Sequence, residues 1–216
     1  MSPSDPLAAE GGTPVYAGPW PSWPLFDPRS ESLVLEALRS RRWAISGRYV
    51  GSESFERRFA RAFADFHVIA HCVPTTNGTS ALTIALQALD IGPGDEVLVP
   101  GLTWVARASA VLALGAVPVL VDVEADTLCM DLKRARERLT EGTRVILLVH
   151  LYCTVVDLDG FASLARETGV ALLEDCAQAH GACWRGRRVG HLRAAGGVQH
   201  AAGEGANQRR GRRGDH

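Results

Sequence analysis

Apolar segments alternate with helical patterns along the chain from Gly92 to Cys176. The predicted strands are 96–100, 117–123, 144–150 and 170–176. The predicted helices between them are 103–114, 131–139 and 158–168. Strands that alternate with helices of about ten residues are typical of βαβ units. We therefore predict an α/β fold with a mainly parallel sheet.

Three further segments come before this alternating region. Residues 1–28 include seven prolines, a density that does not allow helices or central strands, so we predict an extended arm. Helical spacing predicts a helix at 30–40 and an amphipathic helix at 52–66. The second helix carries four phenylalanines at helical spacing: Phe55, Phe59, Phe63 and Phe66. Such stripes usually pack in a core, and we predict the same here.

A small polar turn, Asn77-Gly78-Thr79-Ser80, lies between a predicted strand at 71–76 and a predicted helix at 81–89. A turn that leads into a helix N-terminus offers free backbone N–H groups to a phosphate. The glycine spacings of the Walker loop and of the dinucleotide-binding fingerprint are both absent. An ordinary helix cap by Asn77 or Thr79 explains the same residues equally well. Both interpretations therefore remain open.

An acidic pair, Glu174-Asp175, ends an apolar run that shows no alternation and so predicts a strand covered on both faces. Ligands of open α/β sheets bind at the carboxyl ends of strands. A buried aspartate needs a cationic or hydrogen-bonding partner, and a protonated ring nitrogen is one. Together with the turn at 77–80 and with Trp104, which could stack on a ring, the pair predicts a pocket for pyridoxal phosphate.

Composition and charge exclude some classes of protein. The 216 residues are 46% hydrophobic with a net charge of −1, which predicts one large domain, or one domain plus a fragment of a second, and neither a nucleic acid nor a membrane as partner. From Arg185 onward, eight arginines stand against two acidic residues, so a tail that binds RNA or acidic partners is an alternative. Five cysteines without a C-x-x-C pair, and no apolar leader, predict free thiols in the cytoplasm.

The histidines form no metal motif. His67 and His71 are four residues apart, but no glutamate follows His67 and no third ligand has a suitable spacing, so we predict satisfied or exposed side chains. His150 and His180 lie near predicted strand ends. On position alone, each could line a cofactor site or cap a strand.

The motifs resemble the DegT/StrS-type sugar aminotransferases, which have the aspartate-aminotransferase (type I) fold. The matching segments are 76–82, 94–97, 100–104, 121–123, 149–150 and 174–181. A finer resemblance, to L-glutamine-dependent inosose aminotransferases, rests on 42–47, 63–66, 72–76 and 123–127. The resemblance covers roughly residues 21–190. It implies that 29–190 is part of the large domain of such an enzyme, after the arm at 1–28.

The resemblance also implies roles for individual residues. The cofactor-binding residues it implies are Gly78, Thr79, Trp104, Asp175 and Gln178. Gly78 and Thr79 would hold the phosphate of pyridoxal 5'-phosphate, Asp175 would pair with the ring nitrogen, and Gln178 would touch the ring hydroxyl. The loop with Trp43 and Ser46 would lie near the substrate.

The reaction implied by the resemblance is transfer of an amino group from L-glutamine to a keto-inositol. The ketone would be 2-deoxy-scyllo-inosose or scyllo-inosose, in the biosynthesis of aminoglycoside antibiotics, and the intact enzyme would be a homodimer. The alternatives are a nucleotide-sugar aminotransferase or an aminohydroxybenzoate synthase of the same family. A non-catalytic remnant is the alternative from another class.

The sequence departs from the family after residue 190. The family has a Schiff-base lysine after the aspartate strand, whereas the only lysine here is Lys133. Residues 191–216 are rich in glycine, alanine and arginine, and they predict no buried strand. Synonymous codons for 196–215 can be chosen so that a frame one base later encodes Gln-Gln-Gly-Lys, with the lysine near Glu204. We therefore expect an out-of-frame tail, an incomplete large domain, a doubtful dimer and no transaminase activity.

Overall fold

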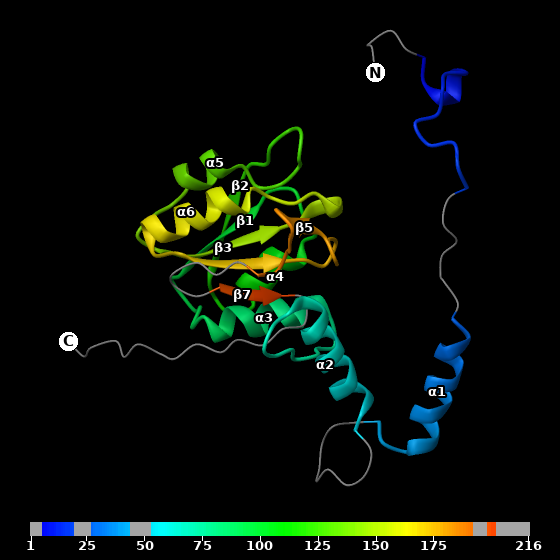
Figure 1. Ribbon diagram of the computed structural model, residues 1–216. Coiled ribbons are helices and arrows are strands. Elements are labelled where there is room, and N and C mark those ends of the chain that lie inside the picture. Colours follow the sequence, from blue (N-terminus) through cyan, green and yellow to red (C-terminus); the bar gives the residue numbers. More distant parts are fainter. Residues whose placement is uncertain (1–5, 20–26, 44–52, 192–197, 202–216) are drawn as a thin grey trace, which may run out of the picture. The chain divides into compact units, whose positions relative to one another are not determined.

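The computed structural model describes residues 6–19, 27–43, 53–191 and 198–201. The chain divides into two compact units, Met1–Val50 and Gly51–His216. The described part of the first unit contains a 3-10 turn, η1 (Ala8–Glu10), and the helix α1 (Pro28–Ser40) (Figure 1). The side chain of Asp27 caps α1 by accepting a hydrogen bond from the backbone N–H of Arg29. The helix predicted at 30–40 is thereby confirmed.

The second unit is built on a five-stranded sheet with the order β2-β1-β3-β4-β7, in which all neighbours are parallel (Figure 1). Its strands are β1 (Glu96–Pro100), β2 (Val117–Val121), β3 (Thr143–Val149), β4 (Ala171–Asp175) and β7 (Val198–Ala201). An antiparallel hairpin of β5 (Cys183–Trp184) and β6 (Arg187–Arg188) follows β4. The predicted α/β fold with a mainly parallel sheet is confirmed.

Helices cover both faces of this sheet. The helices in the described part of this unit are α2 (Phe55–His67), α3 (Gly78–Ala88), α4 (Ala106–Leu112), α5 (Leu132–Glu137) and α6 (Leu158–Thr168), and a 3-10 turn, η2 (Leu151–Cys153), follows β3. Strand residues alternate between two separate cores. Leu98, Ile146 and Leu172 pack with α5 and α6, whereas residues such as Leu147 and Leu173 pack with α3 and α4. Each face of the sheet therefore has its own helix pair.

The strand order reverses once, between β1 and β3. The chain moves from β1 outward to β2, returns past β1 to β3, and continues to β4. At such a reversal the connections after the two adjacent strands leave in opposite directions and open a crevice at the carboxyl edge. The connections concerned start at Gly101 after β1 and at His150 after β3. This position identifies the edge at which a ligand is expected.

Two expectations for the region before β1 were wrong. Residues 71–76 form no strand, since a strand needs a neighbour to complete its hydrogen bonds and Val73 is 48% exposed. The phenylalanine stripe of α2 is not core, because Phe59 and Phe66 are 56% and 46% exposed. The ring of Phe66 instead lies 3.9 Å below the guanidinium carbon of Arg188 on the hairpin.

Strand β7 was not expected from its composition. It extends the sheet beside β4, with Leu172 opposite Val198 and Asp175 opposite Ala201. The pairing uses backbone N–H and C=O groups, which every non-proline residue carries, so an exposed strand edge can accept a segment that lacks an apolar pattern. The hairpin β5–β6 was not predicted either, because strands of two residues are too short to show a period.

All five cysteines lie in the described part of the chain and form no disulfide, as expected. Burial raises the pKa of the Cys129 thiol, which therefore stays protonated at neutral pH. The described residues include no helix that is long and apolar enough to cross a membrane.

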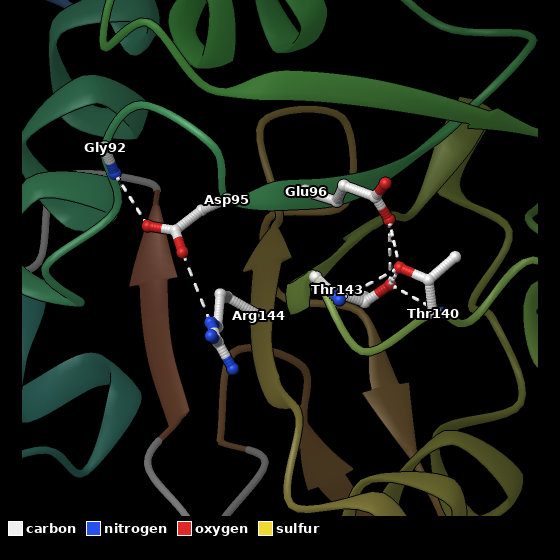
Figure 2. A network of polar contacts seen from close by, with 7 residues as sticks. Gly92, Asp95, Glu96, Thr140, Thr143 and Arg144 are labelled. Carbon is white, nitrogen blue, oxygen red and sulfur yellow. Dashed lines mark hydrogen bonds and ion pairs between the residues drawn. The ribbon is translucent and has the colours of Figure 1, made fainter.

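A polar network fastens the amino ends of β1 and β3, at the edge opposite the crevice (Figure 2). Asp95 accepts hydrogen bonds from the backbone N–H of Gly92 (3.0 Å) and from Nε of Arg144 (3.2 Å). Glu96 accepts from the hydroxyls of Thr140 (2.5 Å) and Thr143 (3.4 Å). The network therefore closes the turn before β1 and joins it to β3.

We expect Asp95→Ala to lower the free energy of unfolding by about 1–2 kcal/mol, because the Gly92 N–H loses its acceptor in a half-buried turn. Arg144→Ala is expected to cost less than about 0.5 kcal/mol, since its side chain is 51% exposed and solvent screens the ion pair. Urea unfolding followed by circular dichroism measures both. Equal costs for the two variants would contradict the assignment of the stabilisation to the turn.

Candidate functional site

The two acidic residues at the end of β4 have different environments. Successive residues of a strand point to opposite faces. Glu174 therefore shares a face with Leu172, which packs against α6, and Asp175 shares the other face with Leu173, which packs with α3 and α4. Both acids are buried, with 0% and 3% of their surface exposed. Each carboxylate must find its partners on its own face.

Glu174 belongs to a buried hydrogen-bond network. Its Oε2 accepts from Nε2 of His150 at 3.1 Å and from the backbone N–H of Gly190 at 2.9 Å. Nδ1 of His150 accepts from the backbone N–H of Val156 at 3.4 Å, so the ring carries its proton on Nε2. His150 is thus a structural residue rather than part of the cofactor pocket.

Two residues of this network, together with Cys176, form the one group of possible metal ligands among the described residues. It consists of His150, Glu174 and Cys176, whose ligand atoms lie within 4.8 Å of one another. Both ring nitrogens of His150 and Oε2 of Glu174 already make hydrogen bonds. The geometry therefore supports a network that fastens β3, β4 and the segment after the hairpin, and not a metal centre. His67 is buried against Phe63 and Phe66, and His71 is exposed.

Asp175 is paired with a cation that the chain itself supplies. Its Oδ2 lies 2.5 Å from Nη2 of Arg107, and its Oδ1 accepts from the backbone N–H of Ala177 at 2.9 Å. Arg107 lies on α4 and is only 5% exposed. The sequence predicted a cationic or hydrogen-bonding partner for this aspartate but did not identify Arg107. A signal was present, because Arg107 falls on the buried stripe of α4 with Ala110 and Val111.

The turn before α3 serves as an N-cap and leaves donors exposed. Oδ1 of Asn77 accepts from the backbone N–H of Ser80 at 2.9 Å, and its carbonyl accepts from Ala81 at 3.1 Å. The backbone N–H groups of Gly78 and Thr79 are the remaining donors of the first turn. Both residues are exposed, and the space next to the Cα of Gly78 is open. The cap and the anion site, which the sequence left as alternatives, are compatible with each other.

Trp104 and Gln178 lie in the loops at the carboxyl edge. Trp104 follows β1 and is 69% exposed. The side-chain oxygen of Gln178 accepts from the backbone N–H of Tyr152 at 2.9 Å, which ties the loop after β4 to the loop after β3. Tyr152 and Cys153 have left-handed backbones with φ of 50° and 65°, a conformation that side chains disfavour and that concentrates at functional sites.

The remaining sequence-based residues are Trp43, Ser46, Glu204 and Lys133. Trp43 lies in the first unit and is 72% exposed. Ser46 and Glu204 lie outside the described residues. Lys133 is exposed on α5, and α5 covers the face of the sheet opposite to Asp175. The single lysine of the sequence is therefore not at the candidate site.

A parallel α/β unit with these motifs at its carboxyl edge defines the class of pyridoxal-phosphate-dependent aminotransferases of the type I fold. The chain belongs to the DegT/DnrJ/EryC1/StrS aminotransferase family, which it matches over residues 27–198. The match ends eight residues after position 190, where the sequence pattern changes.

The similar proteins include two enzymes that act on inososes. The L-glutamine:2-deoxy-scyllo-inosose aminotransferase of Streptomyces fradiae is 52% identical over 191 residues, covering 88% of this chain and 45% of that protein. The L-glutamine:scyllo-inosose aminotransferase of Streptomyces griseus is 51% identical over 190 residues, with the same coverage of 88% and 45%. Among solved structures, 3-amino-5-hydroxybenzoic acid synthase has 40% identity and a TM-score of 0.74 over 81% of this chain and 44% of that chain. The chain thus spans about 45% of the length of the curated relatives it matches.

Pyridoxal 5'-phosphate is the cofactor of this family, and the residues of the chain fit it. The exposed first-turn N–H groups of α3 suit a phosphate, and the buried carboxylate of Asp175 suits a protonated ring nitrogen. Asp175 already stabilises one cation, Arg107, at 2.5 Å. Both features belong to the face of the sheet that α3 and α4 cover.

Proposed function

We propose that the chain is part of an aminotransferase that moves an amino group from L-glutamine to a keto-inositol in aminoglycoside biosynthesis. The observation that carries the proposal is the shared face of Asp175 and the α3 N-terminus, in a chain that is more similar to the inosose aminotransferases than to 3-amino-5-hydroxybenzoic acid synthase. The two inososes are equally supported as substrate, because the two relatives differ by one percentage point in identity. Free thiols favour the cytoplasm as its location.

We propose these roles for the residues of the chain. Backbone N–H groups of Gly78 and Thr79 bind the phosphate, and Trp104 covers one face of the ring. Asp175 keeps the ring nitrogen protonated, and Gln178 donates its side-chain N–H to the ring hydroxyl. When bound, the cofactor would supply an electron sink for the electrons left at the amino-acid carbon and would carry the amino group from donor to acceptor.

We further propose that the lysine of this family is encoded out of frame near Glu204. The family match ends at residue 198, and a frame one base later can encode Gln-Gln-Gly-Lys. The nucleotide sequence tests this step directly. If no single-base shift yields a Gly-Lys segment, the frame hypothesis is wrong, and a non-catalytic remnant becomes the better interpretation, because Lys133 lies on the other face.

The test of the function compares the chain as written with its frame-restored form. Both receive pyridoxal 5'-phosphate and then borohydride, and peptide mass spectrometry locates any reduced cofactor–lysine adduct. We expect a specific adduct only in the frame-restored form. That form is then assayed with L-glutamine against each inosose and against keto-sugar nucleotides. We expect turnover of an inosose and loss of turnover in Asp175→Asn.

The outcomes separate the candidate functions. Turnover of keto-sugar nucleotides alone would favour the nucleotide-sugar aminotransferase, and an aminohydroxybenzoate product would favour the corresponding synthase. An Arg166→Met variant, which changes an exposed residue of α6, is the matched control and should leave turnover unchanged. A frame-restored protein that folds, binds the cofactor and transfers no amino group to any of these ketones would contradict the proposal.

A further inference from the structure

A buried ion pair occupies the carboxylate that the proposed function assigns to the cofactor ring. Nη2 of Arg107 is 2.5 Å from Oδ2 of Asp175, and the two side chains are 6% and 4% exposed. Oδ1 of Asp175 is taken by the N–H of Ala177. Both oxygens of Asp175 therefore have strong donors, and a protonated ring nitrogen would have to compete for one of them.

The guanidinium of Arg107 has fewer of its hydrogen-bonding groups satisfied than the carboxylate of Asp175 has. Among the described residues, its Nε is buried and has no hydrogen-bond partner. A guanidinium normally uses its fork of donors on a carboxylate, and an orphaned buried N–H costs free energy. The ion pair is thus bound through one end of Arg107 only. Of the two donors that hold Asp175, the guanidinium is the movable one, because the other is a backbone N–H of the loop after β4.

We propose that Arg107 is the resident counter-cation of Asp175 and that cofactor loading displaces it from Oδ2. Without the cofactor, Arg107 holds the buried carboxylate oriented toward α4. When the ring nitrogen arrives, it replaces the guanidinium as the cation bound to Oδ2. Because the leaving guanidinium is buried and must find another acceptor, Arg107 lowers the affinity for the cofactor. Arg107 is therefore a positioning residue, and this inference rests on the proposed cofactor site.

The test measures binding of pyridoxamine 5'-phosphate, which needs no lysine, to the full chain by calorimetric titration. We expect Arg107→Met to bind it about tenfold more tightly than the wild type, since one charge-assisted competitor is removed. Arg107→Gln, which still donates a neutral hydrogen bond to Asp175, is the second variant and should show a smaller gain. Arg166→Met is the control and should match the wild type.

Thermal unfolding supplies a second measurement. Without ligand, Arg107→Met should melt several degrees below the wild type, and pyridoxamine 5'-phosphate should raise its melting temperature more than that of the wild type. An analogue with a carbon in place of the ring nitrogen should bind Arg107→Met no more tightly than it binds the wild type. This analogue separates competition at Asp175 from a general widening of the pocket.

Each outcome has one meaning. Equal affinities of the wild type and both Arg107 variants overturn the displacement and leave the cofactor site intact. Weaker binding by the variants also overturns it, because Arg107 would then hold the cofactor itself. No binding of pyridoxamine 5'-phosphate to any form overturns the proposed cofactor site and this inference with it.

Discussion

Asp175→Ala is expected to lower the free energy of unfolding by about 3–5 kcal/mol, because it leaves Arg107 buried without a counter-charge. The two side chains are 4% and 6% exposed and 2.5 Å apart, so water cannot replace the lost carboxylate. The same substitution also removes the acceptor for the N–H of Ala177, which adds the cost of an unpaired backbone donor. Urea unfolding of the full chain, followed by circular dichroism, measures the loss.

The double variant Asp175→Leu with Arg107→Met is the matched control. Replacing both members of a buried ion pair with apolar side chains is often close to neutral, so we expect most of the lost stability to return. Glu137→Ala, which breaks the exposed ion pair with Arg134 on α5, should have little effect. If Asp175→Ala proved as mild as Glu137→Ala, the Arg107 pair would carry no stability, and the displacement proposed above would lose its cause.

Much of the fold follows from the sequence, because the strands β1, β2, β3 and β4 of the central sheet are each a local apolar run. The strand at 96–100 and the helix at 158–168 have the predicted limits. Prediction fails where structure depends on distant partners. Strand β7 exists through backbone pairing to β4, and the phenylalanines of α2 show a core pattern although Phe59 is 56% exposed. A periodic apolar pattern indicates which side chains of a segment can be buried. Which of them are buried depends on the packing of the rest of the chain against that segment.

In the candidate site, too, the sequence predicts the local requirement but not the distant residue that meets it. The need of a buried Asp175 for a cationic or hydrogen-bonding partner follows from the physics of a buried charge, and the structure supplies both kinds of partner, in Arg107 and in the N–H of Ala177. The identity of the cation does not follow, because Arg107 is 68 positions earlier and only the packing of α4 on the sheet brings it near. Likewise, the sequence could not predict the hydrogen bond between Glu174 and His150. Strand alternation places Glu174 and Asp175 on opposite faces, but which residues of β3 lie beside them depends on the register of β3 and β4.

His150→Leu is expected to lower the free energy of unfolding by about 2–3 kcal/mol, because Glu174 then keeps one of the two described donors to its Oε2 in a site without solvent. Both residues are 0% exposed. The variant also loses the acceptor for the N–H of Val156. Since Gly190 is the other donor, we expect local opening of the segment after the hairpin before global unfolding, measured as faster hydrogen exchange there.

Glu174→Gln separates the role of the acceptor from the role of the charge. His150 Nε2 and the Gly190 N–H both donate to the same atom, Oε2, and the single amide oxygen of glutamine can accept both bonds. We therefore expect Glu174→Gln to cost less than about 1 kcal/mol and Glu174→Ala to cost clearly more, because alanine leaves both donors unpaired in the core. If glutamine were as damaging as alanine, the negative charge of Glu174 would be what the core requires, and His150 would have to be an imidazolium rather than the neutral donor that its bond from Val156 indicates.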